Sequence, residues 1–179
     1  MSTAPAVRRP ILYDDERNPE CRRVRLCAMQ LDLDLEIRPC PPRGRRFLEE
    51  AKRLGGVDTP PLLVDEAHGV VLSDPSEIVA HLRKTYPPGE TRTFDEPASE
   101  LELYAYETCP FCAYVRDTLN SLELAYTMRS MGPGSEKRGA FRARYGKTQF
   151  PFLRDARAGI ELFESGDIVH HLRATYGAG

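Results

Sequence analysis

The chain has 179 residues, of which 41% are hydrophobic and 29% are charged, a composition typical of a soluble globular protein with one or two domains. Its 25 basic and 27 acidic residues are mixed along the sequence, and the formal net charge is only -2. This balance excludes a general polycation that would recruit nucleic acid or an anionic membrane. We therefore expect no nucleic-acid partner and no membrane partner.

Export and membrane insertion are also not expected. The first ten residues contain no apolar run of the length found in signal peptides, and no apolar stretch is long enough to span a bilayer. A cytoplasmic location follows, and its reducing conditions would keep the five cysteines from forming a structural disulfide framework. A Cys-x-x-Cys pair in this setting indicates either metal ligation or redox chemistry.

The first predicted elements lie within residues 10–86. Residues 11–13 form an apolar run that suits a buried strand, and Pro19 suits the first turn of a helix, where its missing N-H costs nothing. Apolar residues then recur at helical spacing as far as Leu31. The remaining predicted elements of this region are, in order, a strand over 33–37, a polar helix over 45–54, a strand opened by Pro61, a turn at Gly69, a fourth strand and a helix over 76–84.

Residues 87–100 have the composition of a linker, because they are rich in Pro, Gly, Thr and acidic residues and lack apolar periodicity. The same order of elements then returns within residues 101–177. Its members are a strand over 101–105, a helix beginning at Pro110, a strand over 124–128, a helix over 136–145, a strand opened by Pro151, a turn at Gly159, a fourth strand and a helix over 166–175.

The two regions are copies of one another. Residues 61–86 align with residues 151–176 at a constant offset of 90, and about half of the positions are identical. Upstream, Asn18-Pro19-Glu20-Cys21 aligns with Cys109-Pro110-Phe111-Cys112 at an offset of 91. Two copies of about 80 residues are too few and too long for a solenoid. We expect two complete domains, 10–86 and 101–177, joined by the linker 87–100.

Each domain has the predicted order β-α-β-α-β-β-α, which favours an α/β fold with a small mixed sheet and helices on both faces. This is the order of the thioredoxin fold. The second domain resembles glutaredoxins and the N-terminal domain of glutathione S-transferases in three motifs. They are Cys109-Pro110-Phe111-Cys112 at a helix start, Gln149-Phe150-Pro151 before the third strand and Glu164-Ser165 at the last helix. The chain is therefore interpreted as two tandem thioredoxin-fold domains of the glutaredoxin-like kind.

The Cys-x-x-Cys motif predicts a redox-active dithiol. Cys109 would lie at a helix N-terminus, where free N-H groups and the helix dipole favour a thiolate, so it is the expected nucleophile. Cys112, one turn further along, would resolve the mixed disulfide that Cys109 forms. A second Cys-x-x-Cys or a Cys/His pair that would complete a zinc site is missing from the sequence, so no metal is expected.

The resemblance adds a glutathione site. It implies a cis peptide bond before Pro151, main-chain pairing of Phe150 with the cysteinyl part of glutathione, and capture of the γ-glutamyl group by Glu164 and Ser165. Plainer interpretations are a proline at a strand start for Pro151 and a helix N-cap for Ser165. Lys147 is a further candidate, for the glycyl carboxylate.

The first domain lacks this chemistry. Asn18 occupies the nucleophile position, Cys21 remains only at the resolving position, and Pro75 removes an N-H that a bound anion would need. Two departures affect the second domain. Tyr106 replaces a lysine that glutaredoxins commonly carry, and the charge of Glu107 is expected to oppose thiolate formation.

The expected function is that of a glutathione-linked thiol-disulfide oxidoreductase, which acts on disulfide or glutathionylated substrates with glutathione as co-substrate. Alternatives are a non-catalytic module that binds glutathione or a partner, and a glutaredoxin that binds an iron-sulfur cluster. Glutathione conjugation ranks lower, because transferases form the electrophile pocket with a helical C-terminal domain and this sequence ends directly after the last repeated helix.

Overall fold

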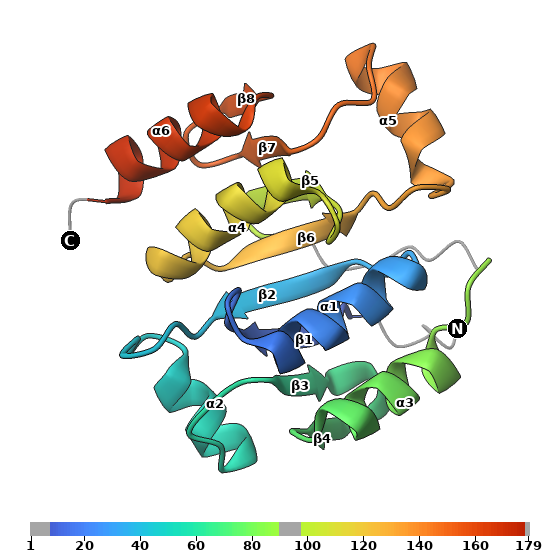
Figure 1. Cartoon of the computed structure of the whole chain (residues 1–179), viewed down its shortest axis with the longest axis vertical. Coiled ribbons are helices and arrows are strands. Elements are labelled where there is room, and N and C mark those ends of the chain that lie inside the picture. Colours follow the sequence, from blue (N-terminus) through green and yellow to red (C-terminus); the bar gives the residue numbers. More distant parts are fainter. Residues whose placement is uncertain (1–7, 90–97, 178–179) are drawn as a thin grey trace, which may run out of the picture.

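The computed structural model describes residues 8–89 and 98–177. The first domain consists of β1 (Ile11–Asp14), α1 (Pro19–Gln30), β2 (Leu35–Pro39), α2 (Leu48–Gly55), β3 (Leu62–Asp65), the short 3-10 helix η1 (Glu66–His68), β4 (Val70–Leu72) and α3 (Pro75–Thr85). The second consists of β5 (Leu101–Ala105), α4 (Pro110–Ser121), β6 (Tyr126–Ser130), α5 (Lys137–Tyr145), β7 (Phe152–Asp155), β8 (Ile160–Leu162) and α6 (Ser165–Tyr176). The predicted order of elements, and with it the prediction of two tandem thioredoxin-fold domains, is confirmed (Figure 1). Residues 90–97 of the predicted linker and residues 1–7 lie outside the described residues.

Two predicted boundaries move, for the same reason in both domains. Strands β2 and β6 begin two residues later than expected, because the chain first turns at the end of the preceding helix. Asp32 and Glu123 adopt positive φ angles of 51° and 48° in these turns. The Leu33 N-H then donates to the Ala28 carbonyl at 2.9 Å, and Leu124 makes the equivalent bond in the second domain. The apolar pattern alone assigns these turn residues to the strands.

Within the described residues, eight strands form one sheet in the order β4-β3-β1-β2-β6-β5-β7-β8. Each domain contributes one parallel pair and two antiparallel pairs, and the two halves join through the antiparallel pair β2 and β6. At this junction Glu36 lies opposite Thr127, its own counterpart at the repeat offset of 91. An approximate twofold axis therefore passes through the middle of the sheet.

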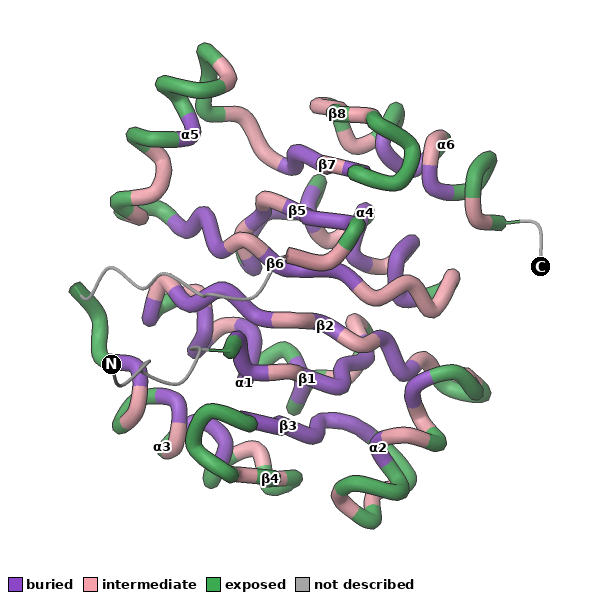
Figure 2. Tube along the Cα trace, turned by 180° about the vertical axis from the view of Figure 1, so that it is seen from behind, coloured by how far each residue is buried: buried purple, intermediate pink, exposed green. Residues whose placement is uncertain are grey.

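The helices cover the sheet in two layers. Helices α1, α3, α4 and α6 pack on one face, where buried side chains of both domains form a single continuous core (Figure 1). On the other face, α2 packs over a small core around Tyr13 and Phe47, and α5 packs over an aromatic core around Phe141 and Phe152. Figure 2 shows that burial is concentrated along the central strands and on the sides of the helices that face them. The first helix of each domain is therefore held against the sheet beside its twin.

Buried ion pairs cross between the two domains. Arg25 of α1 donates to Glu107 at 3.0 Å from Nε and at 3.3 Å from Nη2. Arg116 of α4 donates in the same way to Glu16, at 2.9 and 3.0 Å. The two arginines are repeat equivalents at the offset of 91, and so are the two glutamates. Because all four side chains are buried or nearly so, each domain depends on the other to compensate its charge.

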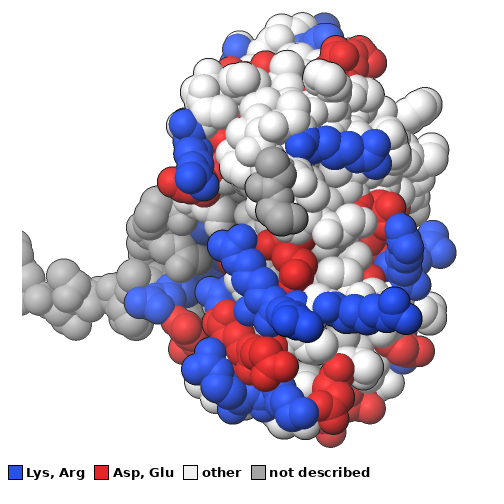
Figure 3. Space-filling view, turned by 90° about the vertical axis from the view of Figure 1, so that its left-hand side faces the viewer, with Lys and Arg blue, Asp and Glu red and all other residues white. Residues whose placement is uncertain are grey.

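The surface carries both signs of charge. Figure 3 shows basic and acidic side chains interspersed on one face of the molecule, as their mixing along the sequence suggests. None of the helices in the described ranges is both long enough and apolar enough to cross a membrane.

Candidate dithiol active site

Cys109 is the N-cap residue of α4. Pro110 occupies the first position of the helix, and the Cys112 N-H donates to the Cys109 Sγ at 3.3 Å. The Cys109 sulfur therefore fills the place that an oxygen fills in an ordinary N-cap, at the positive end of the helix dipole. Cys109 is 3% exposed and Cys112 is fully buried, and neither is in a disulfide.

The two thiols differ in their surroundings. Burial, and then the hydrogen bond with Cys109, raise the pKa of the Cys112 thiol far above its usual range. A buried thiol next to another sulfur keeps its proton. The two cysteines thus differ in position, since Cys109 caps the helix and Cys112 lies inside it.

Tyr106 lies beside both sulfurs. Burial, and then the neighbouring Cys109 and Cys112, raise the pKa of the Tyr106 phenol. Its carbonyl accepts from the Cys109 N-H at 3.2 Å and from Arg116 Nη1 at 3.2 Å. The position that carries a lysine in glutaredoxins therefore supplies an aromatic ring and a hydroxyl here, on a loop that Arg116 fixes.

The expectation about Glu107 requires correction. Its carboxylate is buried and pairs with Arg25 at 3.0 Å and with Arg116 at 3.3 Å. A third arginine, Arg22, lies 3.5 Å away. The negative charge that the sequence places two residues before Cys109 is therefore compensated, and the first domain supplies two of the three compensating arginines.

The second motif lies against the first. The peptide bond between Phe150 and Pro151 is cis, as the resemblance implies, and Pro151 is buried. The Phe150 ring is edge-on to the Tyr106 ring at a centroid distance of 6.3 Å. Next to Phe150, the Gln149 amide donates to the Glu164 carboxylate. Three segments that are far apart in sequence therefore meet at the N-terminus of α4.

The prediction that Ser165 is the N-cap of the last helix is wrong. Glu164 is the N-cap and Ser165 is the first helical residue. Glu164 has a positive φ of 62°, and its side chain makes no capping bond to the helix but contacts Gln149 instead. The first-turn N-H groups of α6 therefore have no side-chain cap, which is the arrangement that suits a bound anion.

Arg138 is a site residue that the sequence did not reveal. Its guanidinium lies over the Phe150 ring at 5.2 Å and over the Tyr106 ring at 5.5 Å. Bonds of 3.0 and 2.7 Å to the Met131 carbonyl hold it there. No sequence signal points to Arg138, because it lies outside the three motifs.

Lys147, the cation proposed from the sequence, lies next to Gln149. Its Nζ donates to the Gln149 Oε1 at 3.0 Å and lies 4.0 Å from the Phe163 ring centroid. Lys147 is exposed, whereas Arg138 is half-buried and held in place. Arg138 is therefore the better ordered of the two cations for a bound carboxylate.

The corresponding place in the first domain is closed. Asn18 caps α1 by accepting from the Glu20 N-H at 2.8 Å and the Cys21 N-H at 3.4 Å. Its amide also donates to the Pro60 carbonyl at 3.0 Å, directly before the cis peptide bond to Pro61. Pro60 has no N-H, so neither main-chain group at the position of Phe150 is available to a ligand.

The end of α3 shows the same contrast with α6. The Asp74 side chain caps α3 by accepting from the N-H groups of Ser76 and Glu77, at 2.9 and 3.0 Å. Cys21 is fully buried, and burial raises the pKa of its thiol far above the usual range. The first domain therefore fills with its own side chains the positions that stay open in the second.

The other two cysteines are core residues. Cys27 lies on the inner face of α1. Cys40 follows β2 in a Pro-rich turn, but it is 2% exposed and packs against the Tyr13 core. Burial raises the pKa of its thiol to about 12.

Comparisons with known proteins give the family. The model of the glutathione S-transferase N-terminal domain matches residues 12–91 and again residues 103–179. A glutathione transferase from Bombyx mori is 22% identical over 64% of this chain and 47% of its own, with a TM-score of 0.37. One from Rhodospirillum rubrum F11 is 23% identical over 63% and 44%, with a TM-score of 0.36. The unclassified transferase 2 of Bombyx mori is 12% identical over 93% and 64%, with a TM-score of 0.38.

The chain spans about half the length of the first two of these transferases, and no curated protein matches it. The family model covers most of both halves, in agreement with the internal repeat. The chain therefore belongs to the glutathione S-transferase N-terminal domain family and carries two tandem copies of that thioredoxin-fold domain.

Proposed function

We propose that the protein is a glutathione-linked thiol-disulfide oxidoreductase in which Cys109 is the nucleophile and Cys112 the resolving thiol. The observation that carries the proposal is the Cys109 sulfur in the N-cap position of α4, where it accepts the Cys112 N-H at 3.3 Å. The first domain, with the same fold, has Asn18 there and caps its helix with an amide. The dithiol is thus specific to one copy.

The reaction is two thiol-disulfide exchanges. The Cys109 thiolate attacks the sulfur of a glutathionylated substrate, forms a mixed disulfide with glutathione and releases the substrate as a thiolate, which takes up a proton. A second glutathione thiolate then attacks the mixed disulfide, which releases oxidised glutathione and restores Cys109. Alternatively, Cys112 loses its proton and attacks, which releases reduced glutathione and leaves the Cys109–Cys112 disulfide. The raised pKa of Cys112 favours the glutathione route.

The surroundings of Cys109 suit glutathione. The main chain of Phe150, before the cis bond, is expected to pair with the cysteinyl part of glutathione. The uncapped N-terminus of α6, with Glu164 and Ser165, is expected to hold the γ-glutamyl group. Arg138, fixed over the Phe150 ring, would take the glycyl carboxylate. These three contacts orient the glutathione sulfur toward Cys109.

A larger substrate has a surface to contact. Phe111, inside the Cys-x-x-Cys motif, is 64% exposed, and Tyr114, one turn later on α4, is 47% exposed. Large exposed aromatic side chains beside a nucleophile are typical of contacts with a protein partner. They support glutathionylated proteins as one class of substrate.

The decisive experiment traps the intermediate. Cys112→Ser protein is treated with oxidised glutathione and its intact mass is measured. One glutathione adduct is expected, located on Cys109 by peptide mapping. The Cys109→Ser/Cys112→Ser protein is the matched control and should remain unmodified, as should the buried Cys21. No adduct on Cys109, in protein that is folded by circular dichroism, contradicts the proposal.

A second candidate is transfer of glutathione to an electrophile, which the family match favours. The Cys109→Ser variant distinguishes the two activities. If conjugation of glutathione to 1-chloro-2,4-dinitrobenzene is the activity, it should survive in the Cys109→Ser protein, because the glutathione sulfur is then the nucleophile. If disulfide exchange is the activity, Cys109→Ser should abolish reduction of a glutathionylated peptide.

A further inference from the structure

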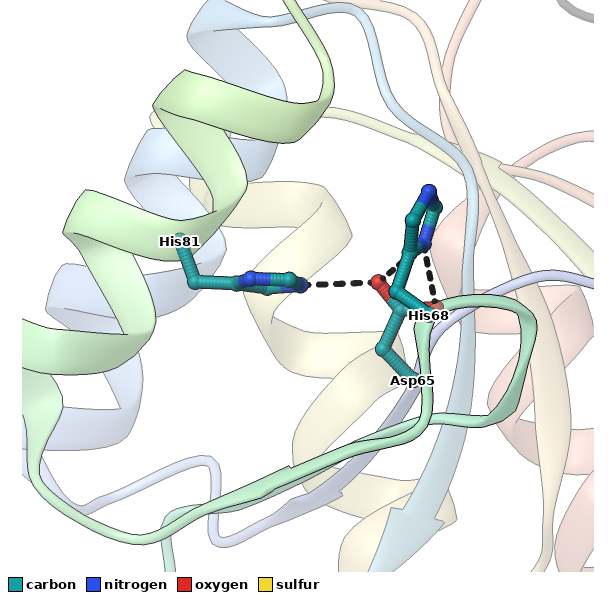
Figure 4. Close-up of side chains that lie close together, drawn as sticks. All are labelled: Asp65, His68 and His81. Carbon is teal, nitrogen blue, oxygen red and sulfur yellow. Dashed lines mark hydrogen bonds and ion pairs between the residues drawn. The ribbon is translucent and has the colours of Figure 1, made fainter.

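A second group of reactive side chains lies in the first domain, away from the dithiol. Three side chains lie within hydrogen-bond distance of the Asp65 carboxylate at the end of β3. His68 Nδ1 lies 3.0 Å from both of its oxygens, His81 Nε2 lies 2.8 Å from Oδ2, and the Tyr86 hydroxyl donates to Oδ2 at 2.8 Å. Figure 4 shows the two imidazole rings directed at Asp65 from η1 and from α3.

The second domain provides an internal comparison. Asp155, His171 and Tyr176 repeat the same contacts, again at 2.8 Å for the histidine and 2.8 Å for the tyrosine. The counterpart of His68 is Ala158, whose N-H donates to Asp155 at 3.0 Å. The Asp-His-Tyr group is therefore a structural feature of both domains, and His68 is an addition confined to the first.

With His68 added, the group has the composition and spacing of a metal site. One carboxylate and two imidazoles, with a fourth position open, form a ligand set that holds zinc in proteins. One ligand atom of each of Asp65, His68 and His81 lies within 4.8 Å of the other two. Tetrahedral ligands at zinc-nitrogen and zinc-oxygen distances of about 2.0–2.2 Å are about 3.3–3.6 Å apart, so the ligand atoms would shift toward these separations to accommodate the ion.

We propose that Asp65, His68 and His81 bind a zinc-type divalent transition-metal ion. Asp65 is fully buried, His81 is half-buried, and the His68 side chain is 42% exposed, so the ion would enter past His68. Each imidazole would bind the ion through the ring nitrogen that faces Asp65, and its other ring nitrogen would carry the proton. In His81 the protonated nitrogen is Nδ1, which lies 3.4 Å from the Thr85 hydroxyl. That hydroxyl can accept a hydrogen bond from Nδ1 and so orient the ring.

The three ligands come from different elements of the first domain, Asp65 from the end of β3, His68 from η1 and His81 from α3. A bound ion would tie the β3–β4 hairpin to the end of α3, and so stabilise the domain that lacks the dithiol.

The test uses the Cys109→Ser/Cys112→Ser protein, so that thiols at the dithiol site do not bind the probe. Zinc chloride is titrated against a chromophoric chelator, and cobalt(II) chloride serves as a spectroscopic probe of the ligands. One equivalent of zinc per chain is expected, with a cobalt spectrum typical of nitrogen and oxygen ligands. His68→Ala should weaken zinc binding by at least ~10-fold. Loss of a residue that only hydrogen-bonds a metal ligand already weakens binding by about that factor, and loss of a ligand should weaken it at least as much.

The twin supplies the control variants. Alanine is the residue that stands at this position in the second domain, so His68→Ala should fold. His171→Ala, in the other domain, should leave zinc affinity unchanged, and Ala158→His should add a second equivalent. Zinc should raise the Tm of the parent protein but not that of His68→Ala. The proposal is overturned if the parent protein fails to bind one equivalent, or if His68→Ala binds as tightly as the parent.

Discussion

The two domains have the same fold but differ in how the free N-H groups at the N-termini of their helices are capped. In the first, Asn18 and Asp74 cap α1 and α3 with side-chain oxygens, and Asn18 also bonds the carbonyl before the cis proline. In the second, Cys109 caps α4 with sulfur, and the start of α6 has no side-chain cap. The fold therefore does not depend on the dithiol. The proposed function assigns the open polar groups of the second domain to a ligand.

The largest expected effect is on activity. Cys109→Ser should lower the rate of reduction of a glutathionylated peptide by ~10³-fold or more, because the nucleophile is lost. Cys21→Ser, at the resolving position of the other copy, should leave the rate unchanged. Steady-state kinetics of the two variants test this. Equal losses in both would show that the first domain takes part in the chemistry.

The next effect is on stability. Arg25→Met should destabilise the fold by about 3–5 kcal/mol, because Asp14 is left buried without its partner and Glu107 loses one of its three arginines. Urea unfolding monitored by circular dichroism measures the change. Arg17→Met, which removes only an exposed pair with Asp117, is the control and should change little. Iodoacetamide should also modify Cys109 more slowly in Arg25→Met, since the charge of Glu107 is then compensated by two arginines instead of three.

A rescue variant sharpens this prediction. Adding Asp14→Asn to Arg25→Met removes the carboxylate that is left without a partner and should recover part of the lost stability. If the double variant is as unstable as Arg25→Met, or more so, the unpaired Asp14 carboxylate is not the source of the effect.

A smaller effect concerns pH. Burial raises the pKa of Asp155, but the hydrogen bonds from His171, the Ala158 N-H and Tyr176 outweigh it and hold the pKa below its usual value. A pKa that is lower in the folded than in the unfolded chain stabilises the fold above the unfolded value of about 3.9, and this contribution is lost as the pH falls through the folded value. Urea midpoints should therefore fall as the pH drops below about 4.

Asp155→Asn removes this contribution. It should cost about 1–3 kcal/mol at neutral pH, the usual range for a buried hydrogen-bonding group, and the remaining stability should depend less on pH in the acid range. An acid dependence as steep as that of the unmodified protein would assign the titration to other carboxylates.

The smallest effect is expected from Asn18→Cys, which gives the first domain a complete Cys-x-x-Cys motif. In the Cys109→Ser protein it should restore no activity, because Pro60 lacks an N-H and Asp74 still caps α3. Loss of the asparagine cap should cost about 1 kcal/mol or less. Any recovered reduction of the glutathionylated peptide would show that the cysteine alone accounts for the difference between the domains.

Local sequence signals predicted the elements and singled out the three motifs that the fold brings together. Pro19 and Pro110 indicate where the two helices begin, and the internal repeat indicates that both domains have the same order of elements. Signals of this kind depend only on residues that are close together in the chain. The pairing of β2 with β6 and the bond between Arg25 and Glu107, 82 residues apart, could not be predicted in this way. The position of Ser165 was missed because the positive φ of Glu164 is a backbone property that its residue type does not announce.

The approximate twofold axis through Glu36 and Thr127 has an evolutionary consequence. In a homodimer built on such an axis, every substitution occurs twice, so both sites change together. Here the two halves are covalently linked, and their association does not depend on protein concentration. One half can therefore change the residues at the starts of its helices while the other half keeps its own, and each half still has a partner to complete the sheet.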